Sequence, residues 1–296
     1  MNSQTKENLV SFGGILGSLI VALAIGFAGS QGGSVVEGVP VFLLCAVFAF
    51  LIQWLMFFPA FIFQTEKYFD VTGSLTYISL ALCAIYLSGA NEPGVILIGL
   101  MVMIWAVRLG TFLFLRISAD GQDRRFRSIK PDFFRFLMTW TVQGLWVLVT
   151  FSAGLAAMTS GKPFPFDVFL GLGIVIWLVG FSIEVIADQQ KRTFKKHPDN
   201  SDKFITHGLW AWSRHPNYFG EIMLWTGIAV AASPMLSGWQ YMTLISPIFV
   251  FVLLTYISGV RMLEARSNKR WGDDVRYQSY CNRTPRLVIK PWLSSE

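Results

Sequence analysis

The sequence predicts an all-α membrane protein: a polytopic helical bundle of about eight transmembrane helices with both termini in the cytoplasm. The first observation behind this prediction is composition. The 296 residues are 53% hydrophobic and 14% charged, with a mean hydropathy of +0.51, whereas soluble domains are about 25% charged. The second observation is that 22 of the 24 Lys and Arg residues fall on one side of the predicted spans, as the positive-inside rule requires.

The predicted spans are apolar runs of about 20 residues, the length needed to cross roughly 30 Å of hydrocarbon. A count between seven and ten fits the pattern, and eight fits it best. The runs cover residues 9–28, 40–63, 74–90, 94–115, 136–158, 166–187, 218–236 and 239–260. The first run is read as a retained helix rather than a signal peptide, because its leader is not strongly basic and no small-residue cleavage site stands out.

The basic residues identify the cytoplasmic side. They lie in residues 1–8, 64–73, 116–135, 188–217 and 261–296, and only Arg108, within a span, and Lys162, on the other side, lie elsewhere. The net charge of +6 therefore follows the membrane topology, so we expect contact with anionic membrane lipids and none with nucleic acid. The outer loops are short, and ligand-binding groups collect on the cytoplasmic face.

Several common catalytic sites are excluded by their missing motifs. The sequence contains no HExxH, CxxC, Walker A, GxGxxG or GxSxG motif and only three histidines, so no metal site is expected. The cysteines lie in spans (Cys45, Cys83) or on the cytoplasmic side (Cys281), where disulfides are rare. A nucleotide would have to bind in an unconventional pocket at the membrane surface.

Two cytoplasmic segments of the N-terminal half carry candidate groups. The first places Glu66, Tyr68 and Asp70 between two spans. These side chains could face a ligand, or Asp70 or Thr72 could simply cap the next helix while Gly73 supplies a turn. The second segment, residues 116–135, contains Arg124 and Arg125, which could bind nucleotide phosphates or form a solvated basic face near lipid phosphates.

The C-terminal half carries a denser polar cluster. Glu184 and Asp188 are four residues apart, hence on one helix face, and Arg192 follows. Residues 207–227 read HGLWAWSRHPNYFGEIMLWTG and place five polar side chains at the start of an apolar run: Arg214, His215, Asn217, Tyr218 and Glu221. Such residues at a membrane edge indicate a functional site. The alternative is structural, with His215 and Tyr218 satisfied by neighbouring helices, Pro216 beginning a span and the tryptophans forming an interfacial belt.

The stretch GLWAWSRHPNYFGEIMLWTG and the tail RWGDDVRYQSYCNRTPRLVIKP resemble the steroid 5α-reductase C-terminal domain superfamily, in particular its DUF1295 branch. The RHPNY core is similar to that of sterol 14-reductases, and RHPxYxG to that of isoprenylcysteine carboxyl methyltransferases. The likeness is strong over residues 180–296 and weak over the first 110. It implies N-terminal transmembrane helices on the substrate side (1–135), a nucleotide-binding C-terminal domain (136–296), and a location in the bacterial inner membrane.

The resemblance implies an NADPH-dependent reductase of a carbon–carbon double bond in a lipid-like small molecule. Asn217, Tyr218 and Glu221 match the reductase motif NYFGE, Asp188 matches an upstream acid that faces the nucleotide, and Arg214 and His215 match the sterol-reductase form. Glu264 falls where the steroid enzymes have His, and Glu184 where they have Asn. By their own chemistry, Arg192, Arg124 and Arg125 suit phosphates, while Trp210 and Tyr218 suit stacking on a planar ring.

The polarising acid and tyrosine of the steroid enzymes have no clear counterpart. Trp105 stands near the position of the tyrosine, and Trp54 rather than Glu follows Gln53. We therefore take Glu66, Tyr68 and Asp70 as replacement catalytic candidates, chosen for their chemistry and side of the membrane. Two alternatives to the reductase stay open: an S-adenosylmethionine-dependent membrane methyltransferase and a non-enzymatic lipid-binding protein. The sequence does not specify an oligomeric state.

Overall fold

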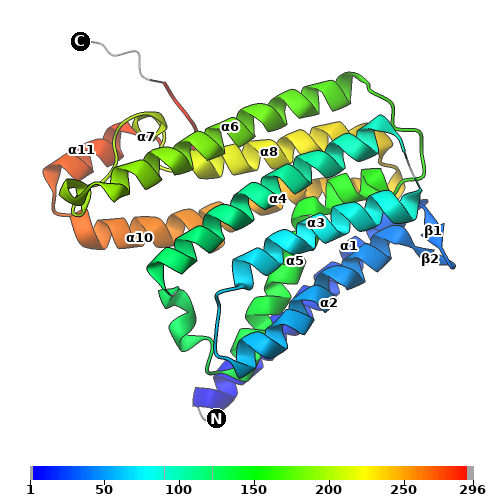
Figure 1. Cartoon of the computed structure of the whole chain (residues 1–296), viewed down its shortest axis with the longest axis horizontal. Coiled ribbons are helices and arrows are strands. Elements are labelled where there is room, and N and C mark those ends of the chain that lie inside the picture. Colours follow the sequence, from blue (N-terminus) through cyan, green and yellow to red (C-terminus); the bar gives the residue numbers. More distant parts are fainter. Residues whose placement is uncertain (1–2, 90, 122, 292–296) are drawn as a thin grey trace. The chain divides into compact units, whose positions relative to one another are not determined.

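The structure, a computed structural model, describes residues 3–89, 91–121 and 123–291. The side chains of residues 3, 4, 119, 120, 124 and 125 fall outside this description. The predicted cofactor residues Arg124 and Arg125 belong to that group, so the predictions for their side chains lie outside the described residues. Helices form nearly all of the regular structure (Figure 1), which confirms the all-α membrane bundle.

Seven helical segments are long and apolar enough to span a membrane within the described part of the chain: Thr5–Ser30, Val41–Ile62, Phe69–Ser88, Pro93–Ser118, Phe133–Met158, Val168–Lys196 and Gly238–Trp271. Each overlaps a predicted span. The remaining predicted span, 218–236, corresponds to the 17-residue helix α8 (Pro216–Ala232), which is apolar but shorter than the roughly 20 residues of a full crossing. The chain is an integral multi-pass membrane protein.

The chain divides into two compact units. Unit 1 comprises residues 1–171 and 229–246, and unit 2 comprises residues 172–228 and 247–296. The functional division that we predict at residue 135 stays a prediction.

Unit 1 is built around α5. Its helices are α1 (Ser3–Ser30), α2 (Val41–Ile62), α3 (Phe69–Ser88), α4 (Pro93–Asp120) and α5 (Phe133–Met158), with the 3-10 segments η1 (Arg124–Ser128), η3 (Ser233–Met235) and η4 (Gly238–Leu244). Helix α5 contacts each of the other four helices and is 78% buried over its most apolar stretch, against 28% for α1. Asp132 caps its first turn by accepting a hydrogen bond from Arg135 N at 2.8 Å.

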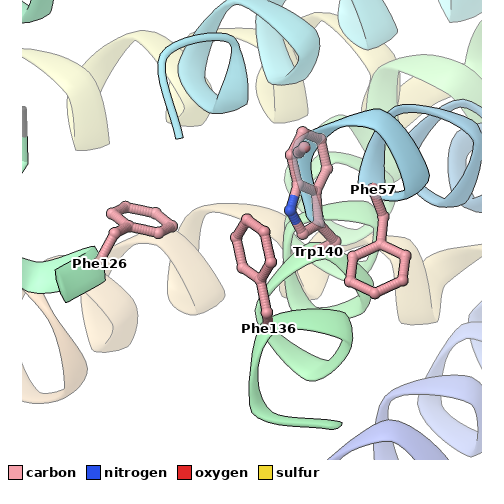
Figure 2. Packing of buried hydrophobic residues seen from close by; sticks show 5 residues of the cluster. Phe57, Phe126, Phe136 and Trp140 are labelled. Carbon is pink, nitrogen blue, oxygen red and sulfur yellow. The ribbon is translucent and has the colours of Figure 1, made fainter. Parts of the chain in front are cut away.

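One aromatic cluster of unit 1 packs α2, η1 and α5 together. Figure 2 shows Phe57 from α2, Phe126 from η1, and Phe136 and Trp140 from α5. All four side chains are buried, and neighbouring rings meet edge to face, as Phe57 and Phe136 do at 5.7 Å between centroids. A small hairpin precedes α2: β1 (Val35–Val36) pairs with β2 (Val39–Pro40). Glu37 and Gly38 both have positive φ, as a two-residue hairpin turn demands.

Unit 2 contains most of α6 (Val168–Lys196) and α8, together with α9 (Ile245–Val252), α10 (Gly259–Trp271), α11 (Val275–Arg283) and the short α7 (Leu209–Trp212) and η2 (Pro198–Asn200). A π-helical turn, η5 (Leu253–Ile257), links α9 to α10. Pro216 begins α8, as predicted, because a proline at the first helical position has no amide hydrogen to leave unsatisfied.

Candidate functional site

Helices α6 and α8 lie side by side in unit 2 (Figure 1) and touch through glycines. Gly173 and Gly180 on α6 face Gly227 and Gly220 on α8, and the two glycines of each helix are seven positions apart. A Cβ atom on Gly180 would lie 2.7 Å from the Gly220 oxygen, and one on Gly227 would lie 2.6 Å from the Gly173 oxygen. Small residues at such spacing let two membrane helices approach until their backbones touch. The pairing makes the two helices antiparallel and fixes their register.

This register places the part of α6 that carries Glu184 beside the first turns of α8. A Cβ on Gly220 would lie 2.7 Å from the Glu184 nitrogen, so Glu184 lies next to the segment that carries Asn217 and Glu221. Glu184 and Asp188 are 2% and 8% exposed. Asn217 and Glu221 are half-buried and four residues apart, hence on one face of α8. Four predicted polar residues of unit 2 are thus held by one helix contact.

The end of α6 is fastened to α7 by Trp210. The Trp210 indole is buried, donates from Nε1 to the Ala187 oxygen at 3.0 Å, and packs with Ala187 and Ile205. The Lys191 ammonium lies 4.4 Å from the centre of the indole ring, a cation–π contact. Stacking of Trp210 on a cofactor stays a prediction. The Lys191 ammonium already contacts one face of the ring. Arg192 is exposed on the same helix.

The Glu264 carboxylate on α10 contacts basic side chains from two other segments of unit 2. We call Arg214, His215, Glu264 and Arg286 the Glu264 hub. Glu264 Oε1 lies 2.9 Å from Arg214 Nη1 and 3.3 Å from His215 Nε2, and Glu264 Oε2 lies 3.2 Å from Arg286 Nε. Arg214 and His215 precede α8, Glu264 lies on α10, and Arg286 follows α11. The hub carries two guanidinium charges against one carboxylate, so it favours an anionic ligand.

The C-terminal tail holds the segment before α8 by backbone pairing. Tyr280 OH donates to the Trp210 oxygen at 2.7 Å. Three further hydrogen bonds run from Arg214 N to the Pro285 oxygen (2.9 Å), from Ser213 Oγ to the Leu287 oxygen (2.7 Å) and from Lys290 N to the Trp212 oxygen (3.1 Å). The tail and the RHPNY segment therefore form one structural piece.

His215 presents an imidazole nitrogen in a defined protonation state. Burial lowers the pKa of His215 below its ordinary value, while the hydrogen bond and charge of Glu264 oppose that shift and Lys191 and Arg214 add to it. The neutral ring has one N–H, and a carboxylate can only accept, so Nε2 carries the hydrogen. Nδ1 then holds a lone pair; it is buried and has no hydrogen-bond partner among the described residues. The ring stacks on Tyr218, with centroids 5.9 Å apart.

Two consecutive residues therefore each carry a buried nitrogen, one a hydrogen-bond donor and the other an acceptor. Arg214 Nε is a donor that is buried without a partner among the described residues, and His215 Nδ1 is an acceptor in the same condition. Buried polar atoms left in this state cost about 1–3 kcal/mol each, which a ligand with both kinds of group would recover. The Tyr218 ring packs against Gly259 at the start of α10. A Cβ on Gly259 would lie 2.8 Å from Tyr218 Cε2.

The three catalytic candidates lie in unit 1. Glu66 is 6% exposed; its Oε2 accepts from Lys130 Nζ at 2.5 Å and its Oε1 from Asp123 N at 2.8 Å. Asp70 lies 4.0 Å from Arg116 Nη2, and Tyr68 is 48% exposed. Both oxygens of Glu66 are thus used to join the 64–73 segment to the 116–135 segment.

The capping alternative for this segment is wrong. The cap position of α3 is Tyr68, which makes no side-chain cap bond. Asp70 lies in the first turn, and Thr72 Oγ1 donates backwards to the Tyr68 oxygen at 2.7 Å. Gly73 lies inside α3 rather than at a turn. The Gln143 amide occupies the space where a Cβ on residue 73 would lie. The helix begins five residues before the apolar run that predicted it.

A largely open, mostly apolar pocket contains none of the predicted site residues. It has a volume of about 540 Å³ and belongs to unit 1. Its lining is Ala24, Phe27, Ala28, Ser30, Gln31, Trp239 and Met242. The mostly apolar lining suits a lipid chain rather than a nucleotide.

Sequence reasoning missed Arg286, Lys191 and the buried glutamines of unit 1. Arg286 was one of eight basic residues after position 260, and its pairing with Glu264 depends on the course of the tail. Polar residues inside apolar runs are a usable signal, and Gln53 and Gln143 carry it.

Comparison with known proteins identifies the family. The family model described as "Protein of unknown function (DUF1295)" matches residues 18–284, and the chain belongs to this family. Human 3-oxo-5-alpha-steroid 4-dehydrogenase 1 is 30% identical over 100 residues, 34% of each chain. Steroid 5-alpha-reductase DET2 of Gossypium hirsutum is 34% identical over 99 residues, 33% of each chain. Probable O-methyltransferase ustE of Ustilaginoidea virens is 30% identical over 98 residues, 33% of this chain and 34% of that protein. The chain thus spans about a third of the length of these relatives.

Proposed function

We propose that this DUF1295 chain is an integral-membrane reductase that uses NADPH to reduce a carbon–carbon double bond in a lipid-like small molecule. The proposal is supported by the similarity to proteins named as steroid 5-alpha-reductases. The structural observation that carries it is the pair of buried, unpartnered nitrogens of Arg214 and His215 at the Glu264 hub, within the described residues. Bacterial inner membrane is the proposed location, with the hub on the cytoplasmic, basic side.

The donor and acceptor groups of unit 2 fit a dinucleotide. NADPH offers anionic phosphates, hydroxyl and amide donors, and planar rings. Arg214 and Arg286 suit the phosphates, while Asp188, Asn217 and Glu221 suit ribose hydroxyls or the carboxamide. His215 Nδ1 accepts a hydrogen bond from a ligand N–H or O–H.

When bound, NADPH supplies a hydride to an electron-poor carbon. The residues of this chain bind and orient the nucleotide and exclude water from the site. The tail holds the RHPNY segment in place, and the glycine contact holds α6 against α8, so the polar groups are fixed before the ligand arrives. Such preorganisation reduces the cost of ordering on binding.

The groups of unit 1 serve different purposes in this proposal. Glu66 anchors two cytoplasmic segments through Lys130 and Asp123 N. Tyr68, with its exposed phenol, is the better candidate for donating a proton to the substrate, and Asp70 is the next. Arg124 and Arg125 are proposed to contact phosphates.

A second candidate function has its own support. The similarity to a probable O-methyltransferase favours transfer of a methyl group from S-adenosylmethionine to a hydroxyl. Such a reaction removes a proton from the acceptor hydroxyl, and a neutral imidazole oriented by a carboxylate is suited to take it. His215 and Glu264 have that arrangement.

A binding experiment separates these candidates. The purified protein in detergent is titrated with NADPH, NADH and S-adenosylmethionine while its melting temperature is followed. We expect NADPH to stabilise the fold by about 2.7 kcal/mol at a concentration 100 times Kd. Stabilisation by S-adenosylmethionine alone would establish the second candidate, and no response to any of the three would favour a lipid-binding protein without either activity.

Variants test whether NADPH binds at the Glu264 hub and the first turns of α8. Asn217→Ala, Glu221→Gln and His215→Ala should each weaken NADPH binding by about tenfold, the value of one lost hydrogen bond to a charged or buried group. The control is Arg276→Ala, which removes an 86% exposed arginine of unit 2 that pairs with its near neighbour Asp274. Equal NADPH affinity in all four variants would place the nucleotide elsewhere.

A further inference from the structure

A second group of buried polar atoms lies in unit 1, within the spans. Gln53 of α2 is 0% exposed, and its Nε2 donates to Thr76 Oγ1 of α3 at 2.8 Å. The Thr76 hydroxyl already donates to the Thr72 oxygen at 2.7 Å, so it must accept from Gln53. The amide orientation is therefore fixed by chemistry, and Oε1 is an acceptor. That oxygen is buried and has no hydrogen-bond partner among the described residues.

Gln143 of α5 repeats this arrangement. Its Nε2 donates to the Phe69 oxygen at 3.0 Å, and a carbonyl can only accept, so its Oε1 is also an acceptor. This oxygen too is buried and unpartnered within the described chain. Trp140, almost one turn earlier on α5, is fully buried, and its indole Nε1 donor has no partner there either.

Gln53 and Gln143 contact the same section of α3, between Phe69 and Thr76. A Cβ on Gly73 would lie 2.6 Å from Gln143 Nε2, and a Cβ on Gly144 would lie 3.4 Å from Gln53 Cγ. Gln53, Thr76 and Gln143 all lie within helices that are long and apolar enough to span the membrane.

The kinds of unpartnered atom restrict what can bind. Unsatisfied polar atoms inside a membrane are costly, and here there are two acceptors and one donor. A ketone or ester would add another acceptor and satisfy only the Trp140 N–H. A cation would be repelled by the Trp140 N–H, and its buried charge would be costly. A hydroxyl group donates to one glutamine oxygen and accepts from the indole, so it satisfies two of the three.

We propose that the Gln53, Trp140 and Gln143 side chains bind the hydroxyl group of an apolar alcohol inside the membrane-spanning part of unit 1. The proposal goes beyond the reductase proposal, because it concerns binding by unit 1 and holds whether or not the bound molecule is reduced. A water molecule could serve the same three atoms, and this is the competing outcome of the test.

The test measures binding without nucleotide. Full-length protein in detergent is incubated with tritiated farnesol, a fifteen-carbon alcohol, and the bound label is counted by scintillation proximity. Unlabelled farnesol and farnesyl methyl ether compete with it. The two competitors match in their apolar part, but the ether lacks the O–H donor. We expect the alcohol to compete about tenfold better than the ether, the value of one buried hydrogen bond.

A buried glutamine elsewhere in unit 1 supplies the matched control. Gln240 is 1% exposed, and both ends of its amide are used: Nε2 donates to the Gly29 oxygen at 3.2 Å and Oε1 accepts from Ser237 N at 3.0 Å. Gln53→Met combined with Gln143→Met removes both acceptor oxygens and should abolish the preference for alcohol over ether. Gln240→Met should lower the melting temperature and keep the preference.

Two results would overturn the proposal. Equal competition by alcohol and ether in the unmodified protein would mean that water alone serves these atoms. A preference that survives when both Gln53 and Gln143 are replaced by Met would place the alcohol elsewhere. Because no nucleotide is present, neither result depends on whether NADPH binds unit 2.

Discussion

Substitution of Gly220 by alanine is the sharpest perturbation of the contact between α6 and α8. The new Cβ would lie 2.6 Å from the Gly180 oxygen and 2.7 Å from the Glu184 nitrogen. Both neighbours are backbone atoms of a helix, so no side chain can rotate away to make room. The helices themselves must separate.

The size of the effect follows from these distances. Ordinary contact with a Cβ begins at 3.4 Å, so α6 and α8 must move apart by about 0.8 Å, the difference between 3.4 and 2.6 Å. Overpacking of this kind costs about 1–3 kcal/mol, and the better helix propensity of alanine returns about 0.5–1 kcal/mol. We expect the free energy of unfolding to fall by about 1–2 kcal/mol. NADPH affinity should fall as well, because Glu184 and Asp188 shift relative to α8.

The assay compares Gly220→Ala with Gly17→Ala by chemical and thermal unfolding in one detergent. Gly17 lies inside α1, and a Cβ there would meet nothing within 4 Å, so its replacement should be neutral or stabilising by up to about 1 kcal/mol. If Gly220→Ala proved as stable as Gly17→Ala and bound NADPH equally well, α6 and α8 would not be in backbone contact.

Three further predictions concern the charged groups. Glu264→Gln removes the common partner of Arg214 and Arg286 and should lower the free energy of unfolding by about 1–3 kcal/mol, measured by urea unfolding; an unchanged midpoint would contradict the hub. Glu66→Gln should cost about 3 kcal/mol by leaving the Lys130 ammonium unpaired, and adding Lys130→Met should recover at least half of it; a double-mutant cycle without coupling would refute the pair. Burial lowers the pKa of His215 below its ordinary 6.5, so the folded state resists protonation, and stability should be full above this value and fall as the pH drops through it. His215→Gln should lose that part of the pH dependence of the melting temperature, and an unaltered profile would show that His215 is not buried neutral.

The membrane helices were predictable because hydropathy and the distribution of basic residues act over whole segments. Each predicted span overlaps a helix of the described chain. The start of α3 was placed too late, since its first turn, with Asp70, is polar. Apolar content identifies the part of a helix in lipid, whereas hydrogen bonding in the backbone continues beyond it. The same reasoning explains why α6 extends to Lys196, past the predicted end.

The candidate site was predictable only as a set of residues. Motif spacing and chemistry selected Arg214, His215 and Glu264, and the structure joins them at the hub. The part played by Arg286 depends on the path of the tail, which pairs with a segment about 70 residues earlier. No local pattern records such a pairing. The unpartnered oxygens of Gln53 and Gln143 were hidden for the same reason, since a sequence does not show which polar atoms find partners.

Transfer of the reducing hydrogen is the most direct test of the proposed function. The purified protein is incubated with a lipid extract of membranes and with NADPH deuterated at carbon 4 of the nicotinamide, and the lipids are examined by mass spectrometry. We predict a lipid product heavier by one deuterium and one hydrogen than its unsaturated precursor, absent from the His215→Ala protein. Appearance of a methylated lipid with S-adenosylmethionine, and of no deuterated lipid with NADPH, would contradict the reductase proposal.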